Sequence, residues 1–321
     1  MMTLSSSPLR TAVARLWQID RPLTAAGLGF AALLPLALLG IVLDPRTIAG
    51  APAWLKPAKF LASTAVYSLT LAAYFAWLPE WPRLRRSLSA TTVAVFAVEI
   101  AIIAVQAARG TTSHFNVSTP TDAALFAVMG VGIVVQTVAS VGVAWALVRQ
   151  PFADTAMAFA LRAGMIVTIL GAASGGLMTS PTRAQLAAAQ ATGHMEAAGS
   201  HTVGAPDGGP GLPGVGWSRE HGDLRVAHFV GLHAMQILPL LALVARRRVL
   251  HNPRRMHIAS VSYAALFGIL LLQALRGEAL VAPGTATAAL FAIWFVSTVV
   301  ALLMTTRRHA ADVMPTSAMV A

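Results

Sequence analysis

Residues 121–148 read TDAALFAVMGVGIVVQTVASVGVAWALV, and this stretch decides the fold class. Its one charged residue, Asp122, lies at the beginning, and the remainder is apolar or uncharged. A helix needs about 20 mostly apolar residues to cross a bilayer. Because a segment in lipid must satisfy its own backbone hydrogen bonds, we predict a membrane-spanning helix here.

Seven more stretches of this kind occur in the chain. They cover residues 24–43, 58–78, 89–108, 155–178, 225–245, 258–275 and 283–305. Only 11% of the residues are charged, whereas a soluble domain carries roughly 25%. The sequence therefore predicts an all-α integral membrane protein with about eight transmembrane helices, and the lipid bilayer is its first partner.

Two of the predicted helices begin with residues that are typical of helix N-termini. Thr119 precedes Pro120 and Asp122, and Asp223 precedes the stretch 225–245. Threonine and aspartate side chains accept hydrogen bonds from the free N–H groups of a first helical turn. We expect both residues to act as N-caps. The alanine-rich segment 183–198 is expected to form a short helix between two spans.

The basic residues indicate an orientation. Alternate connections hold fourteen lysines and arginines, and the opposite connections hold six. Because the richer side normally faces the cytoplasm, we expect both termini, 1–23 and 306–321, to be cytoplasmic in a bacterial inner membrane. The net charge of +11 lies in short clusters between apolar blocks, which argues against nucleic acid as a partner. The absence of cysteine excludes disulfides and thiolate metal sites.

Three pairs of short segments indicate an internal duplication. VQAARG at 105–110 corresponds to LQALRG at 272–277, AALFA at 123–127 to the same letters at 288–292, and AKF at 58–60 to AHF at 227–229. The separations are nearly equal, so we predict two parallel four-helix repeats, 24–148 and 149–305. Proteins built from such repeats often place a site between the halves.

Glu99 is the first candidate for a functional residue, because it lies near the middle of a predicted span. Charged groups at that depth are costly and usually functional. Gln106 shares its face of the helix, and Arg109 lies at the outer edge. The alternative is that Glu99 pairs with Arg109 or a hydroxyl and only holds helices together.

Histidines on the span 225–245 are the second group of candidates. His233 lies inside the span, His228 lies nearer its end, and Gln236 falls between them around the helix. The long connection 179–224 is rich in glycine and proline and holds His201 and His221. Imidazoles with nearby carboxylates suit a transition metal, although the spacing matches no compact metal motif.

Lys59 and Arg276 complete a set of polar residues on the predicted extracytoplasmic side. Our leading hypothesis is a pocket there that hosts a metal- or haem-assisted enzymatic step. Glu99 and His233 would be catalytic, and His228, His221 and His201 would hold the metal. A small-molecule ligand would contact Lys59, Gln106, Arg109, Gln236 and Arg276.

Two other functions are compatible with the same residues. In a proton-coupled transporter of a small, anionic solute, Glu99 and His233 would form the coupling pair. In a non-catalytic membrane component, the connection 179–224 would bind a partner. An enzyme needs access from one side, whereas a carrier needs access from both.

Overall fold

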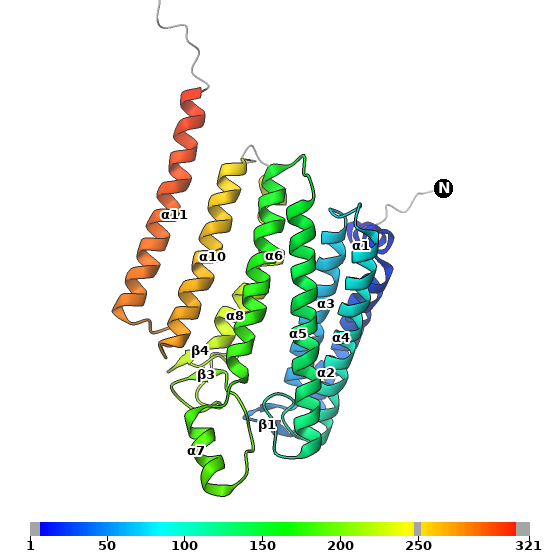
Figure 1. Ribbon diagram of the computed structural model, residues 1–321, viewed down its shortest axis with the longest axis vertical. Helices are drawn as coiled ribbons and strands as arrows, with labels where there is room; N and C mark the ends of the chain where they lie inside the picture. The colour runs from blue at the N-terminus through cyan, green and yellow to red at the C-terminus, as the bar shows by residue number, and fades with distance from the viewer. Residues whose placement is uncertain (1–6, 247–251, 313–321) are drawn as a thin grey trace, which may run out of the picture. The chain divides into compact units, whose positions relative to one another are not determined.

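The computed structural model describes residues 7–246 and 252–312, with side chains to residue 305 (Figure 1). Arg247 and Arg248 of the orientation signal, and residues 313–321 of the expected tail, lie outside the described residues. The chain separates into two compact units. Unit 1 comprises Met1–Gln150 with Met178–Ser200, and unit 2 comprises Pro151–Leu177 with His201–Ala321.

Unit 1 is a helical bundle with a small hairpin. Its helices are α1 (Pro8–Ile19), α2 (Arg21–Leu43), α3 (Leu55–Phe75), α4 (Pro82–Arg109), α5 (Pro120–Arg149) and the short α7 (Arg183–Thr192). Strands β1 (Thr47–Ile48) and β2 (Ala51–Pro52) pair antiparallel between α2 and α3. Helix α3 packs between α2 and α4, and α4 also packs on α5. Phe30, Leu61 and Phe96 form the centre of one core cluster.

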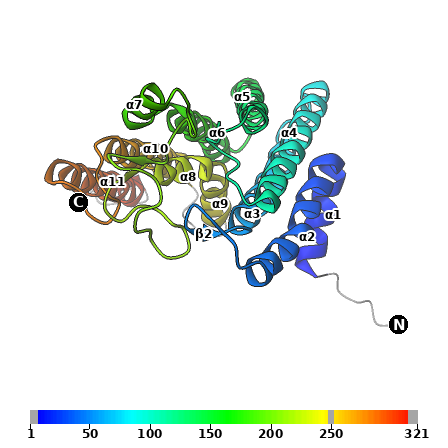
Figure 2. The ribbon, with the colours of Figure 1, turned by 90° about the horizontal axis from the view of Figure 1, so that it is seen from below.

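Unit 2 has a second helical bundle. Its helices are α6 (Thr155–Gly176), α8 (Leu224–Leu232), α9 (Ala234–Arg246), α10 (Pro253–Leu275) and α11 (Thr285–Asp312), and a 3-10 turn, Leu177–Thr179, follows α6. Strands β3 (Thr202–Val203) and β4 (Gly222–Asp223) pair antiparallel. Helix α10 packs against α6, α8 and α11, as Figure 2 shows. Val167, Phe267 and Leu270 lie in its core.

The helices agree with the predicted all-α membrane class. Among residues 7–246 and 252–312, six helices are long and apolar enough to cross a membrane, and the bent pair α8 and α9 would make a seventh. Helix α3 has spanning length but is not among them, because lysines, hydroxyls and tyrosines interrupt its apolar surface. The count of eight spans stays a prediction.

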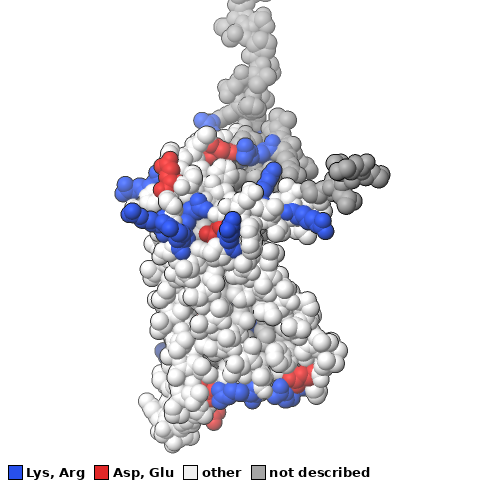
Figure 3. Space-filling view, turned by 90° about the vertical axis from the view of Figure 1, so that its right-hand side faces the viewer, with Lys and Arg blue, Asp and Glu red and all other residues white. Residues whose placement is uncertain are grey.

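Lipid contact explains the surface of these helices. On α5, Val131 and Val138 have exposed fractions of 65% and 66%. A soluble protein seldom exposes large apolar patches of this kind. Figure 3 shows Lys, Arg, Asp and Glu side chains gathered at the two ends of the face in view, with a largely uncharged zone between them.

Local expectations from the sequence are confirmed at three places. Thr119 caps α5 by accepting a hydrogen bond from the N–H of Asp122, and Asp223 caps α8 by accepting from Arg225. Helix α7 occupies the first part of the alanine-rich segment. Each cap satisfies an N–H group that the helix itself leaves unpaired.

The predicted connection 179–224 is divided between the two units. Residues 178–200 pack in unit 1, on the loop between α4 and α5. The N–H of Val117 donates to the carbonyl of Glu196 (3.0 Å), and the N–H of Ala198 donates to that of Phe115 (2.8 Å). Gly199 has a φ of +125°, and a Cβ there would lie 2.3 Å from the Met178 carbonyl oxygen. Residues 201–224 belong to unit 2.

An ionic clamp closes the loop between α2 and α3. The Arg46 guanidinium lies 2.6 Å from Asp44 and also donates to the carbonyl of Ala108 at the end of α4 (3.0 Å). The Trp54 indole donates to Asp44 (2.9 Å). The Arg46 guanidinium and N–H and the Trp54 indole together hold the pKa of Asp44 well below its usual range.

The clamp predicts an acid-sensitive contribution to stability. The folded-state pKa is lowered, so the contribution is present above the unfolded pKa of about 3.9 and is lost as pH falls through the folded value. Thermal unfolding in detergent measures it. We expect Asp44→Asn to lower Tm at pH 6, and the difference from wild type to shrink as pH falls below about 4. A constant difference would contradict this.

Unit 2 depends on a close contact between two glycines. A Cβ built at Gly171 of α6 would lie 2.6 Å from the backbone of Gly231 of α8, closer than side-chain atoms tolerate. Small residues at such crossings let membrane helices pack backbone to backbone.

Gly171→Ala therefore destabilises the fold, by about 1–3 kcal/mol for overpacking. Gly268→Ala on α10 is the matched control, because no atom lies within 4 Å of its added methyl group. Midpoints of unfolding in a denaturing detergent compare the two variants. Equal midpoints would show that the contact does not constrain α6 and α8.

Candidate functional site

The buried face of α4 carries a line of polar residues. Ser89, Thr92, Glu99 and Gln106 are each 2% exposed or less. Their spacings of three and seven residues place them along one side of a helix with 3.6 residues per turn. The same face is otherwise apolar, with Phe96 and Ile103 between the polar groups.

Glu99 is the buried carboxyl that the sequence singled out, and it has no hydrogen-bond partner. Neither of its oxygens is satisfied in the described part of the chain. It faces α5 near Gly132, where an added Cβ would lie 3.8 Å from the Glu99 Oε1. The pairing with Arg109 that we considered from the sequence does not form, because Arg109 binds Asp122 instead.

A second polar group lies between α3 and α5. The Tyr67 hydroxyl lies 3.0 Å from the Ser140 hydroxyl and accepts a hydrogen bond from Gln136 Nε2 (3.2 Å). The Tyr67 ring also meets the Phe96 ring of α4, with centroids 5.1 Å apart.

These three residues are not among the predicted site residues. Gln136 and Ser140, four apart in an apolar span, are the signal that could have identified them. Buried oxygens of Ser68, Thr92 and Gln136 also have no hydrogen-bond partner among the described residues.

Gln106 and Arg109 lie together at the C-terminal end of α4. Asp122, 3% exposed, accepts from Gln106 Nε2 (2.8 Å) and from the Arg109 guanidinium (2.7 Å). The Thr119 hydroxyl donates to its second oxygen (2.6 Å). The network ties the end of α4 to the beginning of α5. The predicted substrate-binding roles of Gln106 and Arg109 stay predictions, as does that of Lys59, which is exposed on α3.

The C-terminal end of α10 in unit 2 has a closely similar local structure. Gln273 Nε2 donates to the carbonyl of Ala279 (2.7 Å), six residues on, as Gln106 donates to that of Thr112 (3.3 Å). The glycine after each arginine has a φ of +74°. Arg276 forms its ion pair with Glu278 (2.8 Å), so this arginine too has an acidic partner.

His233 lies at a break in the span 225–245. Helices α8 and α9 meet there at a bend of 44°. Thr168 of α6 satisfies the broken backbone: its hydroxyl donates to the carbonyl of Leu232 (3.3 Å) and accepts from the N–H of Met235 (3.1 Å). Pro239 lies inside α9, and a proline removes a helical hydrogen bond and displaces the carbonyl four residues before it.

The predicted site residues of this span surround the break. The His233 ring packs on the Phe229 ring, with centroids 4.1 Å apart. The Gln236 amide nitrogen can donate to the carbonyls of Leu232 and His233 (3.3 and 3.2 Å). His228 Nδ1 lies 2.7 Å from the Gly171 carbonyl. Because a carbonyl only accepts, Nδ1 carries a hydrogen there.

The loop histidines do not assemble with these residues into a metal centre. His201 Nδ1 pairs with Asp207 (2.7 Å), and the His221 N–H donates to the Ser218 hydroxyl (3.1 Å). Within residues 7–246 and 252–312, no three histidine, aspartate or glutamate side chains lie close enough to hold an ion. The metal-ligand roles of His201, His221 and His228 therefore gain no support from the geometry.

Comparison with protein-family models, with curated proteins and with solved structures found no match for this chain. Its function is therefore argued from the arrangement of its own residues. Two arrangements stand out: the unsatisfied carboxyl in unit 1 and the broken helix in unit 2.

Thr168 provides a direct test of the broken helix. Thr168→Val removes the hydroxyl but keeps the branched shape, so the buried N–H of Met235 loses its partner. An unsatisfied buried group of this kind costs about 1–3 kcal/mol. Thr168→Ser keeps the hydroxyl and is the matched control. We expect the valine variant to unfold at lower denaturant concentration than the serine variant; the reverse order would show that the hydroxyl does not stabilise the break.

Proposed function

We propose that this protein is a proton-coupled membrane carrier for a small solute, and that Glu99 binds the coupled proton. The observation that supports this proposal is the Glu99 carboxyl, which is 2% exposed and without a hydrogen-bond donor on a helix of spanning length. Of the three functions that the sequence left open, this one makes most use of that residue.

The physical argument begins with the cost of a buried charge. An ionised carboxylate without donors is strongly destabilised in an apolar interior. Glu99 has no cation or donor bonded to it within the described residues, so uptake of a proton is the simplest way to neutralise it. Ionisable residues inside membrane spans commonly belong to proton relays of pumps and transporters.

Other buried polar groups lie on the same side of α4 toward both of its ends. In one direction lie Thr92 and then Ser89, whose hydroxyl donates to Asp20 (2.8 Å). In the other lies Gln106, which donates to Asp122. Seven residues, about 10 Å of helix, separate Glu99 from Thr92 and from Gln106, so the proposed proton path needs water between these groups.

The broken helix in unit 2 also favours a carrier. Discontinuous helices in transporters expose backbone groups to substrate or ions and bend as the protein changes conformation. The break at His233 lies within a span, and Thr168 of α6 bonds to the backbone on both sides of it. Lys59 lies near the end of α3 that we place on the extracytoplasmic side, and its charge suits an anionic solute. Arg109 and Arg276, which we place on the same side, are paired with Asp122 and Glu278.

We also propose the eight-span topology with two parallel repeats, both termini facing the cytoplasm of a bacterial cell. The similar ends of α4 and α10 support the duplication. The unequal distribution of arginines supports the orientation. In this topology α3 and the pair α8 and α9 are equivalent spans.

A proton flux assay tests the proposed role of Glu99. Purified protein is reconstituted into liposomes that contain a pH-sensitive dye, and a pH gradient is imposed. We expect wild-type protein to move protons in the presence of candidate anions, and Glu99→Gln to abolish the movement, because an amide has no titratable proton. The exposed Glu80, in the turn before α4, provides the matched control variant Glu80→Gln.

Infrared spectroscopy adds a readout that does not depend on the solute. Wild-type protein and Glu80→Gln should show the band of a protonated carboxyl near neutral pH, and Glu99→Gln should lack it. An unchanged spectrum in Glu99→Gln, or full proton movement by that variant, would exclude Glu99 as the proton-binding group.

A further inference from the structure

Helix α1 is strongly amphipathic and differs from the other helices of unit 1. At about 100° per residue, Leu9, Val13, Leu16 and Trp17 fall on one side of it, and Thr11 and Gln18 fall on the other. Arg10 lies at the border next to Trp17, and Arg15 lies on the polar side, about 100° around the helix from Leu16. This distribution is typical of helices that lie flat in a membrane interface.

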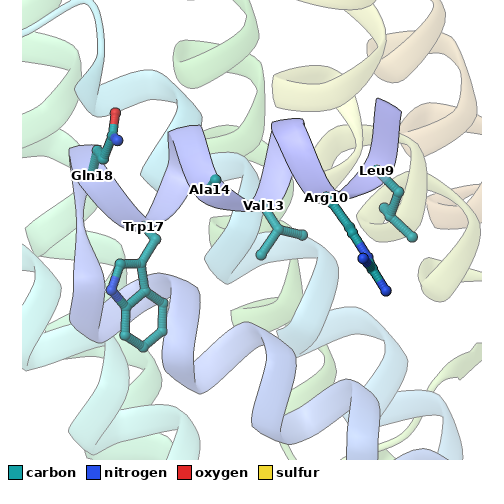
Figure 4. A pocket seen from close by; sticks show the side chains of 6 residues that line it. All are labelled: Leu9, Arg10, Val13, Ala14, Trp17 and Gln18. Carbon is teal, nitrogen blue, oxygen red and sulfur yellow. The ribbon is translucent and has the colours of Figure 1, made fainter. Parts of the chain in front are cut away.

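The apolar side of α1 is only partly covered by the protein. No residue of this helix is buried, and Leu9 and Trp17 have exposed fractions of 74% and 43%. An open hollow of about 540 Å³ runs along it, lined by Leu9, Arg10, Val13, Ala14, Trp17 and Gln18. Figure 4 shows Leu9, Val13 and Trp17 on the side of α1 where α2 begins, and Gln18 on the other side.

The corner between α1 and α2 is firmly held. Asp20 is both the C-cap of α1 and the N-cap of α2, where it accepts from the N–H of Leu23 (2.9 Å). Two residues of α4 complete the corner, because the Ser89 hydroxyl donates to Asp20 and Arg85 donates to the carbonyl of Ile19. Since α2 is a candidate membrane span, α1 ends where that span enters the bilayer.

The charge around the corner is positive. Arg10, Arg15, Arg21, Arg83 and Arg86 are all exposed. Figure 3 shows basic side chains gathered at this end of unit 1. A basic cluster next to a membrane span attracts anionic lipid headgroups, and each arginine near the surface strengthens the attraction.

We propose that α1 is an interfacial helix that binds the surface of an anionic phospholipid bilayer. Leu9, Val13 and Trp17 insert beneath the headgroups, in the space that the hollow marks, and Arg10 and Arg15 contact lipid phosphates. Only Asp20 separates α1 from the candidate span α2, so α1 must lie close to the bilayer surface. The bilayer is therefore the partner that we assign to the apolar side of α1. This inference is independent of proton coupling.

The sequence contains no cysteine, so a single introduced cysteine is labelled without competition from other thiols. Single cysteines replace Leu9, Val13 or Thr11 in the full chain, and each is given a nitroxide label. Thr11 is exposed on the polar side of α1 and does not line the hollow. Accessibility to dissolved oxygen, which enters lipid, is compared with accessibility to a water-soluble nickel chelate. The protein is placed in nanodiscs of phosphatidylcholine, with or without phosphatidylglycerol.

We expect labels at positions 9 and 13 to be reached by oxygen and shielded from nickel in the anionic discs, and the label at 11 to show the reverse. Arg10→Gln and Arg15→Gln should each lower the ratio of inserted to free α1 by about fivefold. Removing phosphatidylglycerol should also lower it. The exposed Arg83, on α4 rather than α1, gives the control variant Arg83→Gln, for which a smaller effect is expected.

Three results would overturn the proposal. Nickel access at position 9 in anionic discs would show that α1 lies away from the lipid. If α1 inserts equally in neutral and anionic discs, and the arginine variants insert as well as wild type, anionic lipid does not contribute to the binding. Spin–spin broadening between labels at position 9 would show that a second copy of the chain covers this surface.

Discussion

The hydrogen-bonding demand of the backbone in lipid is the constraint on which the rest of this structure depends. No water is present in a bilayer core to satisfy an exposed N–H or carbonyl group, so the spans must be helical. Side chains take over wherever a helix ends or breaks. Arg46 donates to the carbonyl of Ala108 at the end of α4, Arg85 donates to the carbonyl of Ile19 at the end of α1, and Thr168 bonds to both sides of the break between α8 and α9. Polar side chains in these units thus serve first to complete the backbone.

Glu99 differs from four aspartates at the helix ends, because neither of its oxygens has a hydrogen-bond partner in the described part of the chain. Asp20, Asp44, Asp122 and Asp223 each cap a helix or accept from an arginine. Such carboxylates are stable in their charged form because donors surround them. A carboxyl without donors costs stability that an apolar residue would not. That contrast, more than its depth in the span, is the reason for assigning Glu99 a role in proton binding.

The predictions from sequence were confirmed for features that depend on interactions between residues close together in the chain. The caps at Thr119 and Asp223 and the short helix at 183 depend on neighbours within one turn, which the sequence displays directly. Partners across helices were harder to predict. Arg109 pairs with Asp122 and not with Glu99, because α5 brings its first turn against the end of α4. Gln136 and Ser140 are a local signal on α5, but their partner Tyr67 lies about seventy residues earlier in the chain, so no local pattern revealed that contact.

The sequence by itself determined that this is a helical membrane protein, where most of its helices begin, and that Glu99 lies inside one of them, because apolar length and capping chemistry act along the chain. Only the tertiary structure decided which polar groups are satisfied. It left Glu99 without a donor, broke one span at His233, divided the long connection between two units and laid α1 beside the start of α2. The physical reason is that hydrogen bonds and burial in a bundle depend on which helices pack together, and the spacing of residues along the sequence does not show which helices do so.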